Sequence, residues 1–510
     1  MRPYPLNRDK YPFIAGAMLA ALAATAGVAR ADQPFLRPQS LVISSSTYDR
    51  GQGAVSALAI GTVLPSSATS TTQAIANNTY GNVWNNSKVD ASFGVTSAIE
   101  LIDIEPHSGH VFERITVPAD QVVTSFPSKS ELGLHITRDR EGPHLVFMGY
   151  AGAGIGALDV SNSDAVPAQD MTNPVTHAFG AQYAFARTIV SMTAGGRFTY
   201  TPTVTYGGNN GRAALLGSNG LYYTVGNSNN GNASQFGAAN GTNPDVTTTT
   251  GLEAVKPIDA SGSTAAIPSG NSAEVAPAIQ YPLGKNGALD KAGKDNNYRG
   301  VTEYGGALYF TKGSGSNGMD TVYTVSSLPT VADAAATRIS VVPGFPTDSA
   351  RATGGDFTPF AVFFANSTTM YVTDEGTGSA IDVNSHAGLQ KWSLVNGTWK
   401  LDYVLSKGAT GTVDHDLYGY DGQYPDVTTV GLRNLTGVVN FDDGTVTLWA
   451  TTSTSSASGD NGADPNKVVR ITDRLDATTV TPEVANETFT TVMGPTYGTV
   501  YRGVAFVGTH

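Results

Sequence analysis

The sequence predicts an all-β protein, a six-bladed β-propeller closed by pairing of the C-terminal strand with the N-terminal blade. Three observations support this in the 510-residue chain: one short strand pattern occurs six times, a second strand precedes five of the copies, and the last strand-like segment lacks a partner. A closed ring of sheets removes the exposed strand edges that an open array would leave.

The recurring pattern is a long apolar residue, one or two β-branched or aromatic residues and a small polar residue, followed by a loop rich in Gly, Ser, Thr or Asp. The six copies occupy residues 41–44, 145–148, 221–224, 308–311, 370–373 and 448–451. Successive copies begin between 62 and 104 residues apart. We therefore expect a fixed unit that carries loops of variable length.

A second strand, rich in small and β-branched residues, precedes five of these copies. These second strands occupy residues 132–134, 213–215, 300–302, 360–362 and 436–438. Turn sequences such as Gly305-Gly306 join the two strands as hairpins. The copy at residue 41 has no such partner, and residues 502–506 form a first strand with no second strand after it. We expect these two ends to pair, with a β-sandwich as the structural alternative.

Later strands complete each unit, for example residues 321–324 in one unit, and 389–393 with 399–403 in another. Four strands per unit and six units give the six blades. Two stretches interrupt the rhythm, residues 62–92 and 226–290, and the second is rich in Asn, Gly, Ser, Thr and Ala. Such composition predicts surface inserts.

Two blade cores resemble those of known families. Residues 359–362 with 370–374, and residues 299–301 with 308–309, resemble blades of NHL-type propellers and of the related gluconolactonase and paraoxonase-like propellers. Residues 81–86 and 93–97 are similar to segments of exported bacterial proteins of unassigned function. These resemblances imply a fold at the level of the blade, and they imply no mechanism.

The N-terminus predicts a signal peptide at residues 1–31. Basic residues precede an apolar run, and Ala29-Arg30-Ala31 offers the small-x-small pattern of a cleavage site. We expect export by a Sec-type route to the periplasm or the medium, and a single propeller domain over residues 32–510. With 42 acidic against 30 basic residues and a net charge of −12, nucleic acid is not expected as a partner. No membrane span is expected after the signal, and the chain is expected to be a monomer.

Propeller geometry places the starts of the first strands around one mouth of the central channel. The residues at these starts are Glu131, Arg212, Arg299, Pro359, Thr436 and Arg502, and the second-strand loops add Asn227 and Lys312. Forked guanidinium groups match carboxylate, sulfate and phosphate oxygens. The predicted function is therefore binding of an anionic ligand, such as an acidic glycan or a small organic or phosphorylated acid. The alternative is that each arginine is a structural tie to a neighbouring blade.

An enzyme on the same face is the second hypothesis, a hydrolase or lyase acting on a lactone, a phosphate ester or an acidic polysaccharide. Tyr48 and Glu131 are the candidates for proton transfer. Calcium is an open question. Hard oxygen ligands are available at Asp374, Glu375, Asp414 and Asp416. The segment from Asp414 fails as an EF-hand loop, and arginines at the mouth would repel a cation, so no cofactor is assigned.

Overall fold

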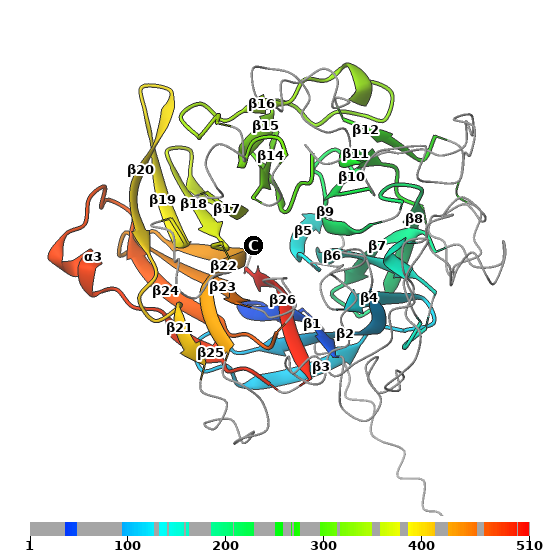
Figure 1. Ribbon diagram of the computed structural model, residues 1–510, viewed down its shortest axis with the longest axis horizontal. Helices are drawn as coiled ribbons and strands as arrows, with labels where there is room; N and C mark the ends of the chain where they lie inside the picture. The colour runs from blue at the N-terminus through cyan, green and yellow to red at the C-terminus, as the bar shows by residue number, and fades with distance from the viewer. Residues whose placement is uncertain are drawn as a thin grey trace, which may run out of the picture. The chain divides into compact units, whose positions relative to one another are not determined.

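The computed structural model divides the chain into two compact units, Met1–Pro34 and Phe35–His510. The described residues all lie in the second unit, and they are 36–47, 94–126, 132–139, 142–152, 154–157, 160–162, 185–207, 209–228, 250–258, 267, 270–275, 296–313, 317–348, 357–377, 386–413, 427–455, 464–496 and 498–508. The expected signal peptide (1–31) and the expected insert at 62–92 lie outside them. The second unit is an all-β propeller (Figure 1).

Four of its sheets each have the size of one propeller blade, and their strands are antiparallel. One contains β9 (Gly211–Leu216), β10 (Tyr222–Gly226), β11 (Gly251–Val255) and β12 (Ser272–Glu274). The next contains β13 (Val301–Tyr304), β14 (Ala307–Lys312), β15 (Thr321–Val325) and β16 (Ser340–Val341). A third contains β17 (Pro359–Asn366), β18 (Thr369–Asp374), β19 (Gly388–Val395) and β20 (Thr398–Leu405). A five-stranded sheet contains β21 (Gly411–Val413), β22 (Val427–Asn440), β23 (Thr445–Ser455), β24 (Val468–Arg474) and β25 (Thr490–Met493).

The remaining strands form one nine-stranded sheet. Its main path is β26 (Thr499–Val507), β1 (Ser40–Thr47), β2 (Val95–Ile104), β4 (Val122–Phe126), β6 (Gly142–Ala151), β7 (Arg187–Thr193) and β8 (Phe198–Thr203), with β3 (Val111–Thr116) beside β2 and β5 (His135–Asp139) beside β6. The described helical segments are short: η3 (Val160–Asn162), η7 (Ala334–Ala336) and α3 (Pro482–Asn486).

The prediction of six separate blades is therefore not reproduced as six separate sheets, because the described residues form five. The physical reason is β4, which pairs with β2 at one end and with β6 at the other and so joins two groups of strands into one sheet. The two ends of the chain do pair: Leu41 of β1 lies opposite Phe506 of β26. Figure 1 shows these two strands, blue and red, side by side.

The expected insert at 226–290 is partly wrong. Within it β11 and β12 supply two strands of a four-stranded sheet, and Leu252 and Ala254 of β11 are buried. These strands are five and three residues long. Their apolar signal is too short to stand out in a segment dominated by Gly, Asn and Thr.

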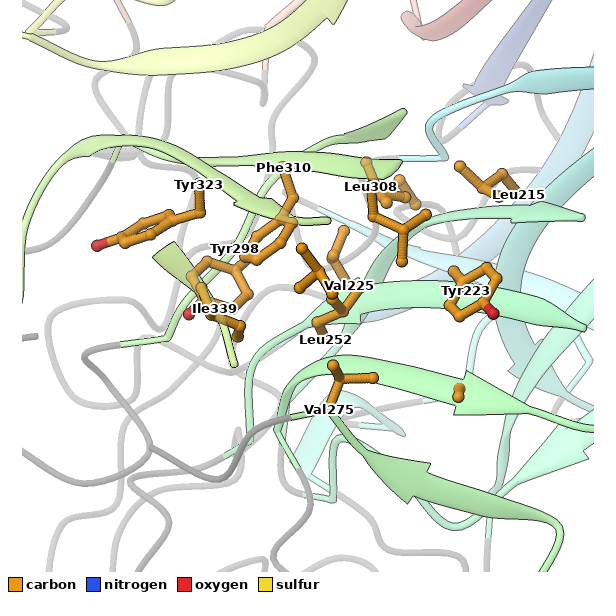
Figure 2. Packing of buried hydrophobic residues seen from close by; sticks show 14 of the residues in the cluster. Leu215, Tyr223, Val225, Leu252, Val275, Tyr298, Leu308, Phe310, Tyr323 and Ile339 are labelled. Atoms are coloured by element: carbon orange, nitrogen blue, oxygen red, sulfur yellow. The ribbon is translucent and has the colours of Figure 1, made fainter. Parts of the chain in front are cut away.

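Each apolar core lies between two consecutive groups of strands. Figure 2 shows one of them, in which Leu308 and Phe310 of β14 pack with Val225 and Leu252 of the neighbouring sheet. The hairpin that presents β14 turns at Gly305 and Gly306, which have φ of 60° and 77°. Glycine tolerates this left-handed backbone at no steric cost, so the predicted Gly-Gly turn is confirmed.

The small polar residue of the recurring pattern ties neighbouring groups of strands together. Thr451 Oγ1 accepts a hydrogen bond from the Asn434 amide at 3.2 Å within its own sheet and donates to the Arg502 carbonyl of the next at 3.0 Å. Three other hydroxyls make the same pair of bonds, each accepting from a backbone amide and donating to a backbone carbonyl. Ser44 accepts from Gly503 and donates to Leu132. Thr311 accepts from Gly300 and donates to Phe360, and Thr373 accepts from Ala361 and donates to Arg433.

The innermost strands contact one another in turn, in the order β5, β9, β13, β17, β22, β26, and β26 contacts β5. Crowding at these contacts explains their small residues. A Cβ on Gly503 would lie 2.2 Å from the Leu132 carbonyl oxygen, and one on Gly300 would lie 2.5 Å from the Phe360 carbonyl oxygen. No larger side chain fits at either position without movement of the backbone.

Candidate functional site: an arginine cluster on the innermost strands

Four arginines occupy the same place on four innermost strands. They are Arg212 in β9, Arg433 in β22, Arg502 in β26, and Arg299 two residues before β13. Backbone contacts support the equivalence. The Arg433 and Arg502 carbonyls accept from the hydroxyls of Thr373 and Thr451. The Arg212 carbonyl accepts from the Gly133 amide, and the Gly300 amide next to Arg299 donates to Thr311 Oγ1. Leu132 and Phe360 hold the same place on the other two strands and accept from Ser44 and Thr311. These six positions therefore lie at the same level of the ring of innermost strands, with Arg433 and Arg502 inside β22 and β26.

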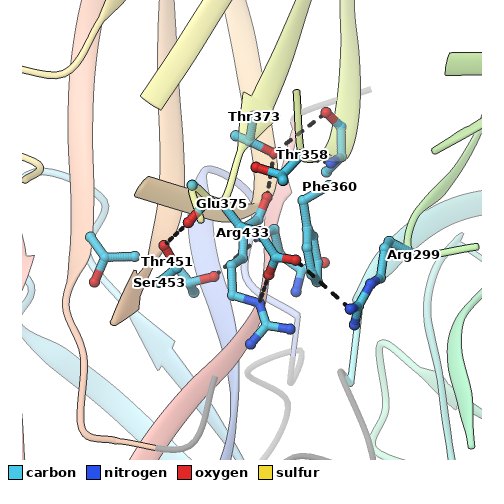
Figure 3. A network of polar contacts seen from close by, with 12 residues as sticks. Arg299, Thr358, Phe360, Thr373, Glu375, Arg433, Thr451 and Ser453 are labelled. Carbon is cyan, nitrogen blue, oxygen red and sulfur yellow. Dashed lines mark hydrogen bonds and ion pairs between the residues drawn. The ribbon is translucent and has the colours of Figure 1, made fainter. Parts of the chain in front are cut away.

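Glu375 lies between two of these arginines. Its Oε1 is 3.8 Å from Arg299 Nη2 and its Oε2 is 3.4 Å from Arg433 Nε. Both arginines also lie over the ring of Phe360, with Cζ at 5.8 Å for Arg299 and 4.5 Å for Arg433. Figure 3 shows the carboxylate between the two guanidinium groups with Phe360 beside them. Two cations thus share one anion and one aromatic face.

The backbone of Glu375 is fixed from both sides. Its amide donates to the Thr358 carbonyl at 3.0 Å, and its carbonyl accepts from Ser453 Oγ at 2.6 Å. The preceding residue, Asp374, is fully buried and anchors the same loop. The carboxylate position of Glu375 therefore depends on its own side-chain torsions rather than on movement of the loop.

The other two arginines bind neutral polar groups. Arg212 Nη2 donates to Asn297 Oδ1 at 2.8 Å, and Arg502 Nε donates to Ser46 Oγ at 3.1 Å. Both arginines are buried. Asn297 and Ser46 carry no charge, so these two contacts orient the guanidinium groups through neutral hydrogen bonds.

The structure also describes two other predicted site residues, Lys312 and Asn227. Lys312 is buried and forms an ion pair with Asp320, Nζ to Oδ1 at 2.6 Å, and the charge of Arg299 acts on the same carboxylate. Burial raises the pKa of Asp320, while the charge of Lys312 opposes that shift. Asn227 is buried at the end of β10, where its amide donates to the Asn210 carbonyl at 3.1 Å.

The metal candidates that can be assessed do not converge. Asp374 accepts hydrogen bonds from the Thr358 amide at 2.9 Å, the Gly376 amide at 2.9 Å and Gln390 Nε2 at 3.2 Å, so both its oxygens serve the protein. Glu375 faces two cations. Among the described residues no group of three His, Asp or Glu side chains could hold a metal ion. Asp414 and Asp416 lie outside the described residues, as do Tyr48 and Glu131.

The arginine at position 433 was missed by the sequence analysis, which placed Thr436 at the start of its strand. The structure puts Thr436 in the middle of β22, where its Oγ1 accepts from the Phe506 amide at 3.1 Å. An irregularity in the pairing of β22 between Leu432 and Leu435 separates the two positions. The likeness of Leu432-Arg433 to Tyr501-Arg502 was the signal available in the sequence.

Comparisons with known proteins identify no family. No family model and no curated protein matches the chain. Among solved structures, a putative oxidoreductase (glucose dehydrogenase) from Thermus thermophilus is 16% identical with a TM-score of 0.31, and the match covers 74% of this chain and 92% of that one. A GH43_1 enzyme from Xanthomonas citri, complexed with xylose, is 12% identical with a TM-score of 0.30 over 66% of this chain and 87% of that one.

A GH43 β-xylosidase/α-arabinofuranosidase from a compost microbial metagenome is 10% identical with a TM-score of 0.30, over 72% of this chain and 96% of that one. At these scores the similarity carries no functional inference, and the resemblance to NHL-type propellers stays a prediction. Within the described part of the chain no helix is long and apolar enough to cross a membrane.

Proposed function

We propose that residues 32–510 form an exported six-bladed propeller that binds an anionic ligand, an acidic glycan or a small organic or phosphorylated acid, through the arginine cluster. The cluster comprises Arg212, Arg299, Arg433 and Arg502. The chain would act as a monomer, with residues 1–31 removed on export.

The packing supports the count of six blades. Among the described residues, five apolar cores lie between consecutive sheets of the ring. A sixth lies inside the nine-stranded sheet, where Val42 and Leu101 of β1 and β2 pack with Leu145 and Phe147 of β6. A sheet that packs against itself in this way behaves as two blades joined through β4.

One observation carries the binding proposal: four of the six equivalent positions on the innermost strands hold arginine. The fold does not require arginine at this position. Leu132 and Phe360 occupy the same place, and their carbonyls accept the same hydrogen bond from a hydroxyl of the neighbouring strands. This hydrogen bond uses only the backbone carbonyl of the residue at this position, so the fold does not fix its side chain. Guanidinium groups in a partly desolvated place attract carboxylate and phosphate oxygens strongly, and two of the four, Arg299 and Arg433, already face one carboxylate.

The test is calorimetric titration of the purified mature protein with citrate, inorganic phosphate and an oligogalacturonate. Arg212→Gln and Arg299→Gln should each weaken binding by on the order of tenfold, equivalent to about 1.4 kcal/mol. Arg474→Gln is the matched control, because the Arg474 side chain is 52% exposed and pairs with Asp476 on the surface.

Melting temperatures of all variants separate lost binding from lost folding. Equal affinities for the wild type, both cluster variants and the control would refute the proposal, as would absence of binding to all three ligands. Release of shortened oligogalacturonate in the same samples would show that the bound ligand is also cleaved.

A further inference from the structure

Glu375 presents the arginine cluster with an anion that belongs to the protein itself. It comes from the loop after β18, whereas its two cationic partners come from the segments of β13 and β22. The two arginines flank β17, whose residue at the equivalent position is Phe360 rather than a third arginine. The carboxylate thus lies where the row of arginines is interrupted.

The geometry of the two ion pairs is loose. The distances of 3.8 Å and 3.4 Å exceed the 2.7–2.9 Å of a charge-assisted hydrogen bond. Here the carboxylate is at the length of a charge-assisted hydrogen bond from neither guanidinium group. A free anion is not tethered to the loop, so it can approach either guanidinium group at hydrogen-bond distance.

Burial makes the replacement of the Glu375 carboxylate by a free anion energetically important. The Glu375 side chain is 5% exposed, and those of Arg433 and Arg299 are 6% and 12% exposed. Removing one partner from a buried ion pair leaves a charge without compensation and destabilises the fold. Glu375 supplies a negative charge to both arginines in the protein without ligand.

We infer that Glu375 is a tethered competitor for the ligand: its carboxylate neutralises Arg299 and Arg433 in the free protein, and the carboxylate or phosphate group of the ligand displaces it. This inference rests on the proposed function, and it adds that Glu375 sets the affinity of the site for its anionic ligand. Ligands with one weak anionic group would lose to Glu375, so the site would select those with a dianionic or chelating group, such as phosphate or a vicinal dicarboxylate.

The decisive variant is Glu375→Gln, which keeps the shape of the side chain and removes its charge. In the absence of ligand we expect a lower melting temperature than that of the wild type, because the arginines repel each other. We expect inorganic phosphate and citrate to bind at least about tenfold more tightly than to the wild type and to raise the melting temperature by more.

Glu375→Asp serves as the second variant if the first folds poorly. Its carboxylate is one methylene shorter and bridges the arginines less well, so its anion affinity should lie between those of the wild type and Glu375→Gln. Glu483→Gln is the control for the change of one charge, because Glu483 is exposed on α3, and it should leave anion affinity unchanged.

The outcomes distinguish this inference from the proposed function. If Arg299→Gln weakens anion binding while Glu375→Gln and Glu375→Asp leave it unchanged or weaken it, the binding site stands and the competitor role is overturned. If Arg299→Gln and Arg212→Gln also have no effect, the binding site itself is wrong.

Discussion

The hydroxyl of Thr451 shows how a single side chain joins two neighbouring blades of the ring. It accepts from a backbone amide on its own sheet and donates to a carbonyl on the next, and it is completely buried. Three other hydroxyls repeat this pair of bonds at equivalent positions. Neighbouring blades are therefore held by polar bonds of fixed geometry at the ring's centre and by apolar packing further out.

Thr451→Val keeps the size of the side chain and removes both bonds. The buried Asn434 amide loses its acceptor, so the free energy of unfolding should fall by about 1–3 kcal/mol. Urea denaturation measures this. Thr478→Val, at an exposed position, should change it by no more than about 0.5 kcal/mol. Equal free energies of unfolding for the two variants would show that the Thr451 hydroxyl does not stabilise the contact between the blades.

The same residues show what sequence can and cannot predict. The small polar residue was recognised as part of the repeat because it recurs at a fixed offset, but its role depends on a carbonyl 51 residues further along the chain in the case of Thr451. Arg212, Arg299 and Arg502 were found for the same reason. Their partners were not, because Glu375 meets Arg299 only after two blades have packed together.

At the level of elements, β24 shares a buried polar cluster with β18, β19 and β20 of the neighbouring sheet. Asp473 of β24 accepts from Tyr403 Oη at 2.7 Å and from Tyr371, and pairs with Lys391 Nζ at 3.0 Å. Burial, followed by the Asp473 charge, raises the pKa of Glu487, which follows α3, to about 8. Burial raises the pKa values of both tyrosines as well. Lys391 is the cation that faces this group of acids.

This cluster predicts a loss of stability as pH rises. In the unfolded chain Glu487 loses its proton near its ordinary pKa of 4.5, whereas in the folded chain it keeps the proton up to about pH 8. The folded state therefore binds more protons over this window, and the free energy of unfolding falls across it. Glu487→Gln, which stays neutral, should remove this part of the slope.

Melting temperatures of both proteins between pH 4.5 and 9 would measure the difference. Other groups titrate in the same range, since burial raises the pKa of Asp103 to about 6 and lowers that of His135 to about 4. Their contributions cancel when the variant is compared with the wild type. Glu483→Gln, on the exposed side of α3, should leave the slope unchanged, and parallel curves for the wild type and Glu487→Gln would contradict the prediction.

At this level the sequence predicted the regular hairpins well and the irregular elements poorly. Strands with a clear apolar alternation and a glycine turn, such as β13 and β14, lie where they were expected. β11 and β12 were taken for an insert because they are short and polar, and the start of β22 was misplaced because its pairing is irregular. The pairing of β4 with both β2 and β6 depends on tertiary structure, and no local sequence pattern predicts it.

For the molecule as a whole, the register of β1 and β26 offers a direct test. Val42 lies opposite Ala505, and the chain has no cysteine. A Val42→Cys, Ala505→Cys double variant should therefore form a single disulfide on oxidation and gain about 2–4 kcal/mol in the free energy of unfolding. Urea denaturation with and without reductant measures the gain.

The matched control moves one cysteine by a single residue, as Val42→Cys with Val504→Cys. Adjacent residues of a strand point to opposite faces, so this pair should not form the bond within one molecule. Equal cross-linking of both pairs, or of neither, would mean that the strands are not held in the observed register.

The joining of β1 to β26 also affects how the protein is made. Ile43 finds its partner Val504 only after all the strands between them have been synthesised. Until then β1 presents an unsatisfied edge to any extended peptide nearby. A messenger RNA broken before the codons of β26 therefore yields a polypeptide in which β1 lacks this partner, and such fragments should be degraded by proteases rather than accumulate.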